Sequence, residues 1–209
     1  MSSETYFHRY ASLYGSLKVI IRASEERVLR DEPDDLFMEN VNFFVKSYLI
    51  SICTYLEAYL QDIALMYANE LDSRVKSADI PHNFVHWRIA KEIKEKDLVF
   101  KNIDLSVNKK EISDNLSGNP YKTIKLFKYL GVDLQSKIGF EENKSFVETV
   151  VTKRNNIIHH NDKAMDVSFS DLLSYVDVFL VYIKSIDDAI NNSGQLKGLR
   201  SNDSVSETT

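Results

Sequence analysis

The hydrophobic positions along the chain follow helical spacing rather than the alternation typical of strands. A first run covers Ser3 to Arg30 and places apolar side chains three or four residues apart. Residues that recur at i, i+3, i+4 and i+7 form one face of a helix packed on a core. An acidic stretch, Asp31 to Asp35, contains Pro33 and interrupts the pattern. The sequence therefore predicts a long first helix followed by a loop. The positions of its apolar face are Tyr6, Tyr10, Leu13, Leu17, Ile20, Ile21 and Val28.

Two further long helices are predicted. The run from Phe37 to Leu71 contains neither proline nor glycine, and its apolar positions cover more than one face. That breadth predicts a central helix with neighbours on several sides. The run from Ser168 to Ile190 predicts a last helix with a single apolar face. The inward positions of that last helix are Leu172, Leu173, Val176, Phe179, Leu180, Ile183 and Ile186.

The middle of the chain is more polar and less periodic. We expect a short helix at Asn83 to Lys96, and a second one at Tyr121 to Leu130 after the turn residues Gly118, Asn119 and Pro120. With no convincing strand pattern, the prediction is an all-α bundle with two long central helices and shorter helices inserted before the helix predicted within residues 140–163. Residues 1–191 are predicted to form one domain, and the polar, serine-rich residues 192–209 a disordered tail.

One stretch, Phe140 to Lys163, combines an amphipathic pattern with concentrated chemistry. Arg154 lies in the middle of its apolar stripe, where a core contact is expected. A charge in that place needs a partner or a function. Glu57, which interrupts the apolar run YLEAYL of the central helix, is the candidate partner. The alternative is that this carboxylate reaches water at the edge of its stripe. The apolar stripe itself consists of Phe146, Val147, Val150, Val151, Ile157 and Ile158.

Two histidines follow Arg154 on the same predicted helix. His159 lies about 140° around an ideal helix from Arg154, and His160 about 240°, so neither stacks on the arginine. Asn155 and His159 are four residues apart and share a face. An arginine and a histidine arranged in this way can close a polar site only if a second surface, such as a symmetric partner helix, completes it.

Several other residues are of types that bind metals, bases or phosphates. His82 and His86 have the i, i+4 spacing of a metal pair, but no accompanying cysteine or HExxH pattern supports a site, so no metal is expected. Trp87 is interpreted as a packing anchor rather than a base-stacking platform. The single cysteine, Cys53, is expected in the core. Lys122, Lys125 and Lys128 share the solvent-facing side of one predicted helix and are candidates for phosphate contacts.

Composition narrows the functional classes. The net charge is −5, which argues against a protein that coats nucleic acid generally. The charge is nevertheless uneven, because residues 88–137 contain eleven Lys or Arg against seven Asp or Glu, so this segment is +4 and the remainder −9. No apolar run approaches the roughly 20 residues of a membrane span. The start of the chain does not resemble a signal peptide. We expect a cytoplasmic protein that does not enter a membrane.

The residues Arg154, Asn155 and His159 form the pattern R-N-x3-H. Together with the predicted bundle and the upstream YLEAYL helix, this pattern resembles the HEPN superfamily, in particular the RiboL-PSP type found in bacterial toxin and phage-defence loci. The resemblance covers Phe37 to Ile190. It implies a metal-independent endoribonuclease without cofactors that works as a homodimer, in which the two motifs meet across the interface. It also implies an RNA substrate, with tRNA as one candidate, and a neighbouring antitoxin or sensor protein.

The resemblance also assigns roles to individual residues. It implies that Arg154 and His159 form the catalytic pair, that Asn155 positions them, and that Glu57 occupies an acidic or polar position on the preceding long helix. His160 also satisfies the looser motif spacing. HEPN toxins controlled by a nucleotidyltransferase have a tyrosine two residues after the histidine, whereas this chain has Asn161, or Asp162 after His160. That departure argues against control through such a tyrosine.

The predicted chemistry has two alternatives. Histidine gains and loses protons near neutral pH, and arginine can contact two phosphate oxygens, so the pair suits RNA cleavage without a metal. The first alternative is a non-catalytic HEPN module that binds RNA or nucleotide or scaffolds a defence complex. The second is a helical structural protein in which Arg154 forms a core ion pair and the histidines mark a helix end. Target choice is expected to reside in the insertion before the motif helix.

Overall fold

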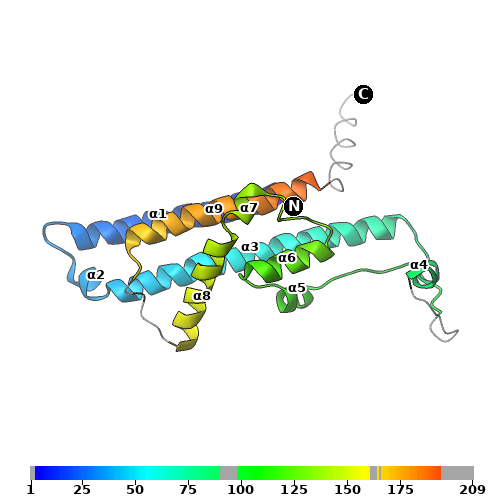
Figure 1. Cartoon of the computed structure of the whole chain (residues 1–209), viewed down its shortest axis with the longest axis horizontal. Helices are drawn as coiled ribbons and strands as arrows, with labels where there is room; N and C mark the ends of the chain where they lie inside the picture. Colours follow the sequence, from blue (N-terminus) through cyan, green and yellow to red (C-terminus); the bar gives the residue numbers. More distant parts are fainter. Residues whose placement is uncertain (1–2, 90–97, 161–163, 165, 194–209) are drawn as a thin grey trace, which may run out of the picture.

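Three long helices build the body of the molecule. The computed structural model describes residues 3–89, 98–160, 164 and 166–193, and the secondary structure there is helical apart from one isolated β-bridge. Helices α1 (Ser3–Leu29), α3 (Val41–Ser77) and α9 (Phe169–Asn192) pack against one another along their lengths (Figure 1). The short α2 (Asp35–Glu39) joins α1 to α3. The predicted all-α bundle is confirmed.

Buried tyrosines fasten these helices to one another. The hydroxyl of Tyr14 in α1 donates a hydrogen bond to the carbonyl of Ile52 in α3 at 2.8 Å. The hydroxyl of Tyr59 in α3 donates to the carbonyl of Ile183 in α9 at 3.0 Å. Both rings are fully buried, so they add a large apolar surface to the core while their hydroxyls remain satisfied. The two bonds tie α1 to α3 and α3 to α9.

Helix α3 is the centre of the core. By length and composition alone it could cross a membrane, the kind of pattern that a buried core helix also produces. Its apolar side chains contact α1, α8 and α9 instead of standing free. The breadth of apolar positions predicted for this segment is therefore explained by neighbours on several sides.

Shorter helices follow α3 and lead to the motif helix. These are α4 (His82–Ile89), α5 (Lys109–Asn115), α6 (Pro120–Tyr129) and α7 (Ile138–Glu141). Helix α8 (Lys144–His160) then crosses α3 steeply in the view of Figure 1. Helix α5 packs on α3, α6 on α8, and α7 on α9. The insertion thus brings the start of α6 next to the place where α8 meets α3.

Several expectations about individual residues were wrong. Trp87, interpreted as a packing anchor, is 61% exposed. Ile20 in α1, and Phe146 and Ile158 in α8, were assigned to apolar faces but are 52%, 36% and 50% exposed. The buried stripe of α8 is narrower than predicted and consists of Val147, Val150, Val151 and Ile157.

Some boundaries also differ from the predictions. Helix α3 continues to Ser77, beyond the predicted end at Leu71. The described part of the helix predicted at Asn83 to Lys96 ends at Ile89, and residues 90–97 lie outside the described residues. Of the predicted tail, residues 194–209 also lie outside them, while Asn192 still belongs to α9.

Candidate active site

Arg154 lies on the inner side of α8, where this helix crosses α3. Its side chain is only 12% exposed, and one of its terminal nitrogens donates a hydrogen bond to Oε1 of Glu57, whose side chain is 28% exposed. The ion pair that the two interrupted apolar stripes suggested is therefore present. This contact anchors one end of the guanidinium at Glu57.

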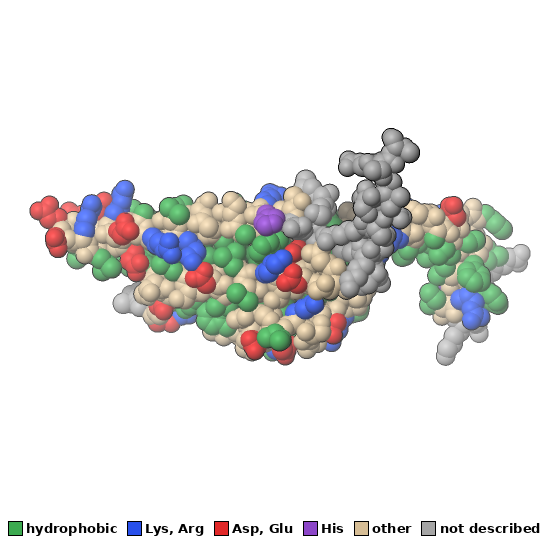
Figure 2. Space-filling view, turned by 90° about the horizontal axis from the view of Figure 1, so that it is seen from above, with side chains coloured by type: hydrophobic (Ala, Val, Ile, Leu, Met, Phe, Trp, Pro, Cys, Tyr) green, Lys and Arg blue, Asp and Glu red, His purple; other side chains and the backbone are tan. Residues whose placement is uncertain are grey.

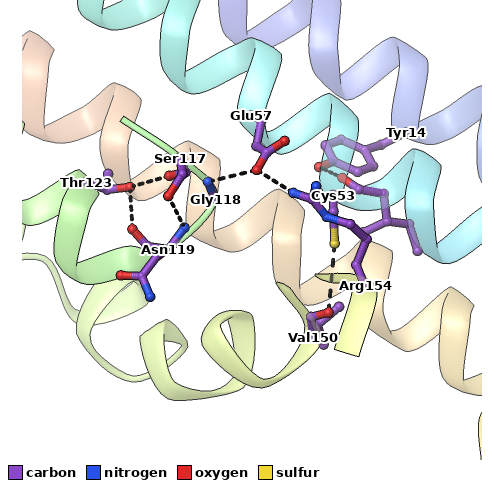
Figure 3. A network of polar contacts seen from close by, with 10 residues as sticks. Tyr14, Cys53, Glu57, Ser117, Gly118, Asn119, Thr123, Val150 and Arg154 are labelled. Atoms are coloured by element: carbon purple, nitrogen blue, oxygen red, sulfur yellow. Dashed lines mark hydrogen bonds and ion pairs between the residues drawn. The ribbon is translucent and has the colours of Figure 1, made fainter. Parts of the chain in front are cut away.

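A third group converges on this ion pair. The backbone N–H of Gly118 donates to the same Oε1 of Glu57 at 3.2 Å, so one carboxylate joins α3, α8 and the start of α6 (Figure 3). Gly118 stands just before α6, whose N-cap residue Asn119 accepts bonds from the N–H groups of Tyr121 and Lys122 at 2.9 and 3.3 Å. The sequence predicted a turn here but not its contact with Glu57.

The loop before α6 is itself well fixed. The hydroxyl of Thr123, which is fully buried, donates to the carbonyls of Ser117 at 3.3 Å and Asn119 at 3.1 Å (Figure 3). These bonds hold the turn in place and so keep the Gly118 N–H directed at the Glu57 carboxylate. A sequence signal existed for the helix start, because Asn followed by Pro is a typical N-cap and first helical residue.

Replacing Gly118 by alanine is expected to destabilise the fold. A β-carbon there would lie 3.1 Å from Cγ2 of Val151 and 3.3 Å from Oε1 of Glu57, both closer than ordinary contact. We expect a loss of about 1–3 kcal/mol in the free energy of unfolding, measured by urea denaturation.

Gly15→Ala is the matched control for that substitution. Gly15 lies on the exposed side of α1 with no atom within 4 Å of the added carbon, so this change should stabilise by about 0.5–1 kcal/mol. If the two variants shift the urea midpoint in the same direction, the close contact at Gly118 is not energetically significant.

Cys53 lies one helical turn before Glu57 and is buried, as predicted. Its thiol points at the carbonyl of Val150 across 4.0 Å (Figure 3). Burial raises the pKa of Cys53 to about 12, although the nearby Arg154 opposes the rise. A thiol that stays protonated is a poor nucleophile, so this cysteine has a packing role beside the ion pair.

The other motif residues lie on the outside of α8. Asn155, His159 and His160 are all exposed, and the two histidines form the last turn of the helix with ring centroids 6.5 Å apart. Within the described part of the chain, no hydrogen bond or ion pair joins His159 to Arg154. The structure therefore brings Arg154 and Glu57 together, and leaves the histidines on a different side of the same helix, as the spacing predicted.

The lysine face of α6 is where the sequence placed it. Lys122, Lys125 and Lys128 are exposed, while Ile124 and Phe127 on the opposite side are buried. Because α6 packs on α8 and begins at the Glu57 contact, this basic face belongs to the same region as the motif helix.

The histidine pair of α4 does not gain further metal ligands. The rings of His82 and His86 have centroids 5.6 Å apart, and both side chains are partly buried. Among the residues that the structure describes, no group of three or more His, Cys, Asp or Glu side chains is arranged to hold a metal ion. Two imidazoles alone are fewer ligands than a stable zinc site uses.

Comparison with known families decides where this arrangement belongs. The family model described as RiboL-PSP-HEPN matches residues 18–192. The chain belongs to the RiboL-PSP-HEPN family. The match extends from within α1 to the end of α9, so it includes Glu57, Arg154 and His159. Searches among curated proteins and among solved structures gave no match. HEPN domains are often ribonucleases, so family membership supports an RNA-related enzymatic function in coarse terms.

Proposed function

We propose that this RiboL-PSP-HEPN protein is a metal-independent endoribonuclease whose catalytic groups are Arg154 and His159. The observation that carries the proposal is the arrangement of α8. One residue of the R-N-x3-H motif is fixed by Glu57 at the crossing with α3, while Asn155 and His159 are exposed for contact with a substrate or a second chain. Every surface helix exposes a polar face, so the support lies in the residue types of this face, an amide and an imidazole at the motif positions beside an anchored arginine.

The chemistry divides between the two side chains. Cleavage begins when the 2′-oxygen of a ribose attacks the adjacent phosphorus and gives up its proton to an imidazole acting as base. The bond from phosphorus to the 5′-oxygen breaks, and that oxygen takes a proton from an acid. The products are a 2′,3′-cyclic phosphate and a 5′-hydroxyl, so no water or metal is consumed. Arg154 stabilises the charge that develops on the nonbridging phosphate oxygens.

The geometry favours a site shared between two chains. His159 is about 140° around α8 from Arg154, so one helix cannot present both groups to one phosphate. A two-fold axis near α8 would place the histidine of one protomer opposite the arginine of its partner, so that each shared site would hold one guanidinium and one imidazole. Asn155, on the face of His159, would position the imidazole or the substrate, and His160 is the alternative acid or base.

The surroundings suggest how RNA is held and controlled. The lysines of α6 are proposed to contact the RNA backbone beside the motif helix. Glu57 anchors one terminal nitrogen of Arg154 and Nε is buried, so the second terminal nitrogen, Nη1, is the one proposed to contact phosphate. We further propose that the protein acts in the cytoplasm as a toxin or phage-defence effector, restrained or triggered by an antitoxin or sensor protein. These assignments rest on the family and on the motif.

A second function has a specific observation in its favour. Arg154 is largely buried and already paired with Glu57, and its Nε is buried with no hydrogen-bond partner among the described residues. An arginine used in this way could serve only to hold α8 on α3. The chain would then be a non-catalytic HEPN module that binds RNA or nucleotide, or a scaffold in a defence complex.

The decisive experiment mixes two inactive variants. Purified Arg154→Ala and His159→Ala proteins are each incubated with total cellular RNA and with tRNA in EDTA, separately and after co-refolding into mixed dimers. A site shared between chains predicts that cleavage returns only in the mixture, because one protomer supplies arginine and the other histidine. Cleavage by wild type but never by the mixture would place both groups in one chain. No cleavage by wild type would favour the binding module.

A further inference from the structure

Helix α4 and the segment 98–102 form a small structural unit beyond the end of α3. A β-bridge pairs Pro81 with Asn102, and the N–H of His82 donates to the carbonyl of Lys101 at 3.0 Å. The N–H of Val99 donates to Oδ1 of Asn83 at 2.8 Å. Backbone and side-chain bonds thus hold the two strips of chain together. This unit, residues 79–89 with 98–104, is called the α4 unit below.

The α4 unit exposes large aromatic side chains. Phe100 is 95% exposed, Trp87 61% and Phe84 54%. The rings of Phe84 and Trp87 have centroids 6.2 Å apart. Figure 2 shows the hydrophobic side chains gathered over this end of the molecule, next to Lys and Arg side chains. Contiguous exposed aromatic surface of this kind marks a binding site more often than a solvated face.

A pocket opens beside the ring of Phe100. Its volume is about 260 Å³, and it is lined by Pro81, Asn83, Val99, Phe100, Lys101 and Asn102. The lining offers one aromatic ring, one ammonium group and two amides. Oδ1 of Asn83 and Nδ2 of Asn102 are engaged, with Val99 and Asp79 respectively. Within the described residues the other polar atom of each amide has no partner, so one donor and one acceptor remain for a ligand.

Two cationic side chains, Lys101 and Arg88, lie in the α4 unit. Lys101 forms no ion pair with any residue that the structure describes, and the guanidinium of Arg88 lies 5.3 Å from the centroid of the Trp87 ring. Asp104 is paired with Lys76, whereas Asp79 bonds the uncharged amide of Asn102 and keeps its negative charge. Lys101 and Arg88 belong to the segment 88–137, whose formal charge is +4, whereas the rest of the chain is −9.

We propose that the α4 unit binds an unpaired nucleotide of single-stranded RNA. Phe100 and Trp87 offer rings on which bases stack, the free amide atoms can bond a base edge, and Lys101 and Arg88 neutralise the flanking phosphates. A base within a duplex is already stacked and cannot enter the pocket. The ligand is therefore a loop, a bulge or a single strand rather than a helix of RNA.

This inference adds to the proposed function and depends on it for its biological meaning. Glu57, the partner of Arg154, lies about 30 Å along α3 from the helix end at Ser77, at 1.5 Å per residue. Figure 1 likewise shows α4 well separated from α8. An unpaired nucleotide held at the α4 unit would thus fix the cleavage site at a distance of several nucleotides. The α4 unit would act as a selector of RNA, separate from the groups that cut it.

The test uses the only tryptophan of the chain as its reporter. Trp87 follows the pocket residue Asn83 by four positions in α4, so the two share a face of the helix. The full chain carrying His159→Ala, which prevents cleavage, is titrated with a short oligoadenylate RNA while indole fluorescence is recorded. We expect quenching by the single strand, and binding weakened by about tenfold or more in Phe100→Ala. Lys101→Ala should weaken binding less and reduce its salt dependence.

Controls separate this site from general RNA affinity. Phe43→Ala removes a phenylalanine that is 64% exposed near the opposite end of α3 and should leave binding unchanged. The inference is overturned if Phe100→Ala binds like Phe43→Ala, if duplex RNA quenches equally, or if AMP alone binds as tightly as the oligonucleotide. Cleavage by wild type is scored independently. Cleavage without quenching would contradict nucleotide binding at the α4 unit alone. Quenching without cleavage would contradict only the proposed ribonuclease activity.

Discussion

RNA cleavage is expected to fall by about 10²–10⁴-fold when His159 is replaced by alanine, the usual contribution of a positioned acid or base. The side chain is exposed in the last turn of α8, so its removal takes nothing from the core. Circular dichroism and the urea midpoint should therefore match those of wild type. The measurement is the initial rate of fragment formation from tRNA in EDTA.

His160→Ala is the matched control, because it removes an adjacent and equally exposed imidazole. If His159 is the acting group, the His160 variant keeps most of the activity. A rate that collapses only in His160→Ala would transfer the role to the second imidazole. Full activity in both single variants and in the double variant would end the catalytic interpretation of the motif.

Arg154→Lys should cost about 10²–10³-fold in cleavage while keeping a positive charge at the same place. Lysine is a compact point charge and lacks the planar fork that contacts two oxygens, so pairing with Glu57 can persist without productive contact with phosphate. Measuring the cleavage rate and the free energy of unfolding on one preparation separates the catalytic role of this side chain from its role in holding α8 on α3.

Arg154→Ala adds a stability readout to the same question. Of the partners that the structure describes for the Glu57 carboxylate, it leaves the Gly118 N–H. Because the two side chains are 12% and 28% exposed, we expect a loss of about 1–3 kcal/mol rather than the larger cost of a fully buried orphan. A folded Arg154→Lys protein with unimpaired cleavage would show that the residue only fastens α8 to α3.

Much of this arrangement was predictable because it follows from the spacing of apolar and charged residues along each helix. Arg154 and Glu57 each interrupt an apolar stripe, and two such interruptions in a bundle tend to meet, since an unpaired charge in a core is costly. The separation of His159 from Arg154 follows from helix geometry alone. The long helices could be read from periodicity, because most of their apolar faces are buried in the observed core.

The remaining features depend on contacts that local spacing does not encode. Gly118 reaches Glu57 across 61 positions of sequence, and a glycine before a proline turn gives no sign of what its N–H will meet. Trp87 was expected inside because tryptophan usually packs, but α4 lies beyond the end of α3, where no helix of the bundle covers it. Ile158 is apolar and yet exposed, because α8 crosses α3 instead of lying along it.

The steep crossing of α8 gives its two ends different freedom. Arg154 sits where the helix is clamped by α3 and by the start of α6, so its backbone opens only with the core. His159 sits in the last turn of α8, and the ends of a helix open more readily than its middle. In the proposed catalytic pair, Arg154 is thus a fixed site for the phosphate and His159 a mobile acid or base. The imidazole can adjust its position after the phosphate has bound.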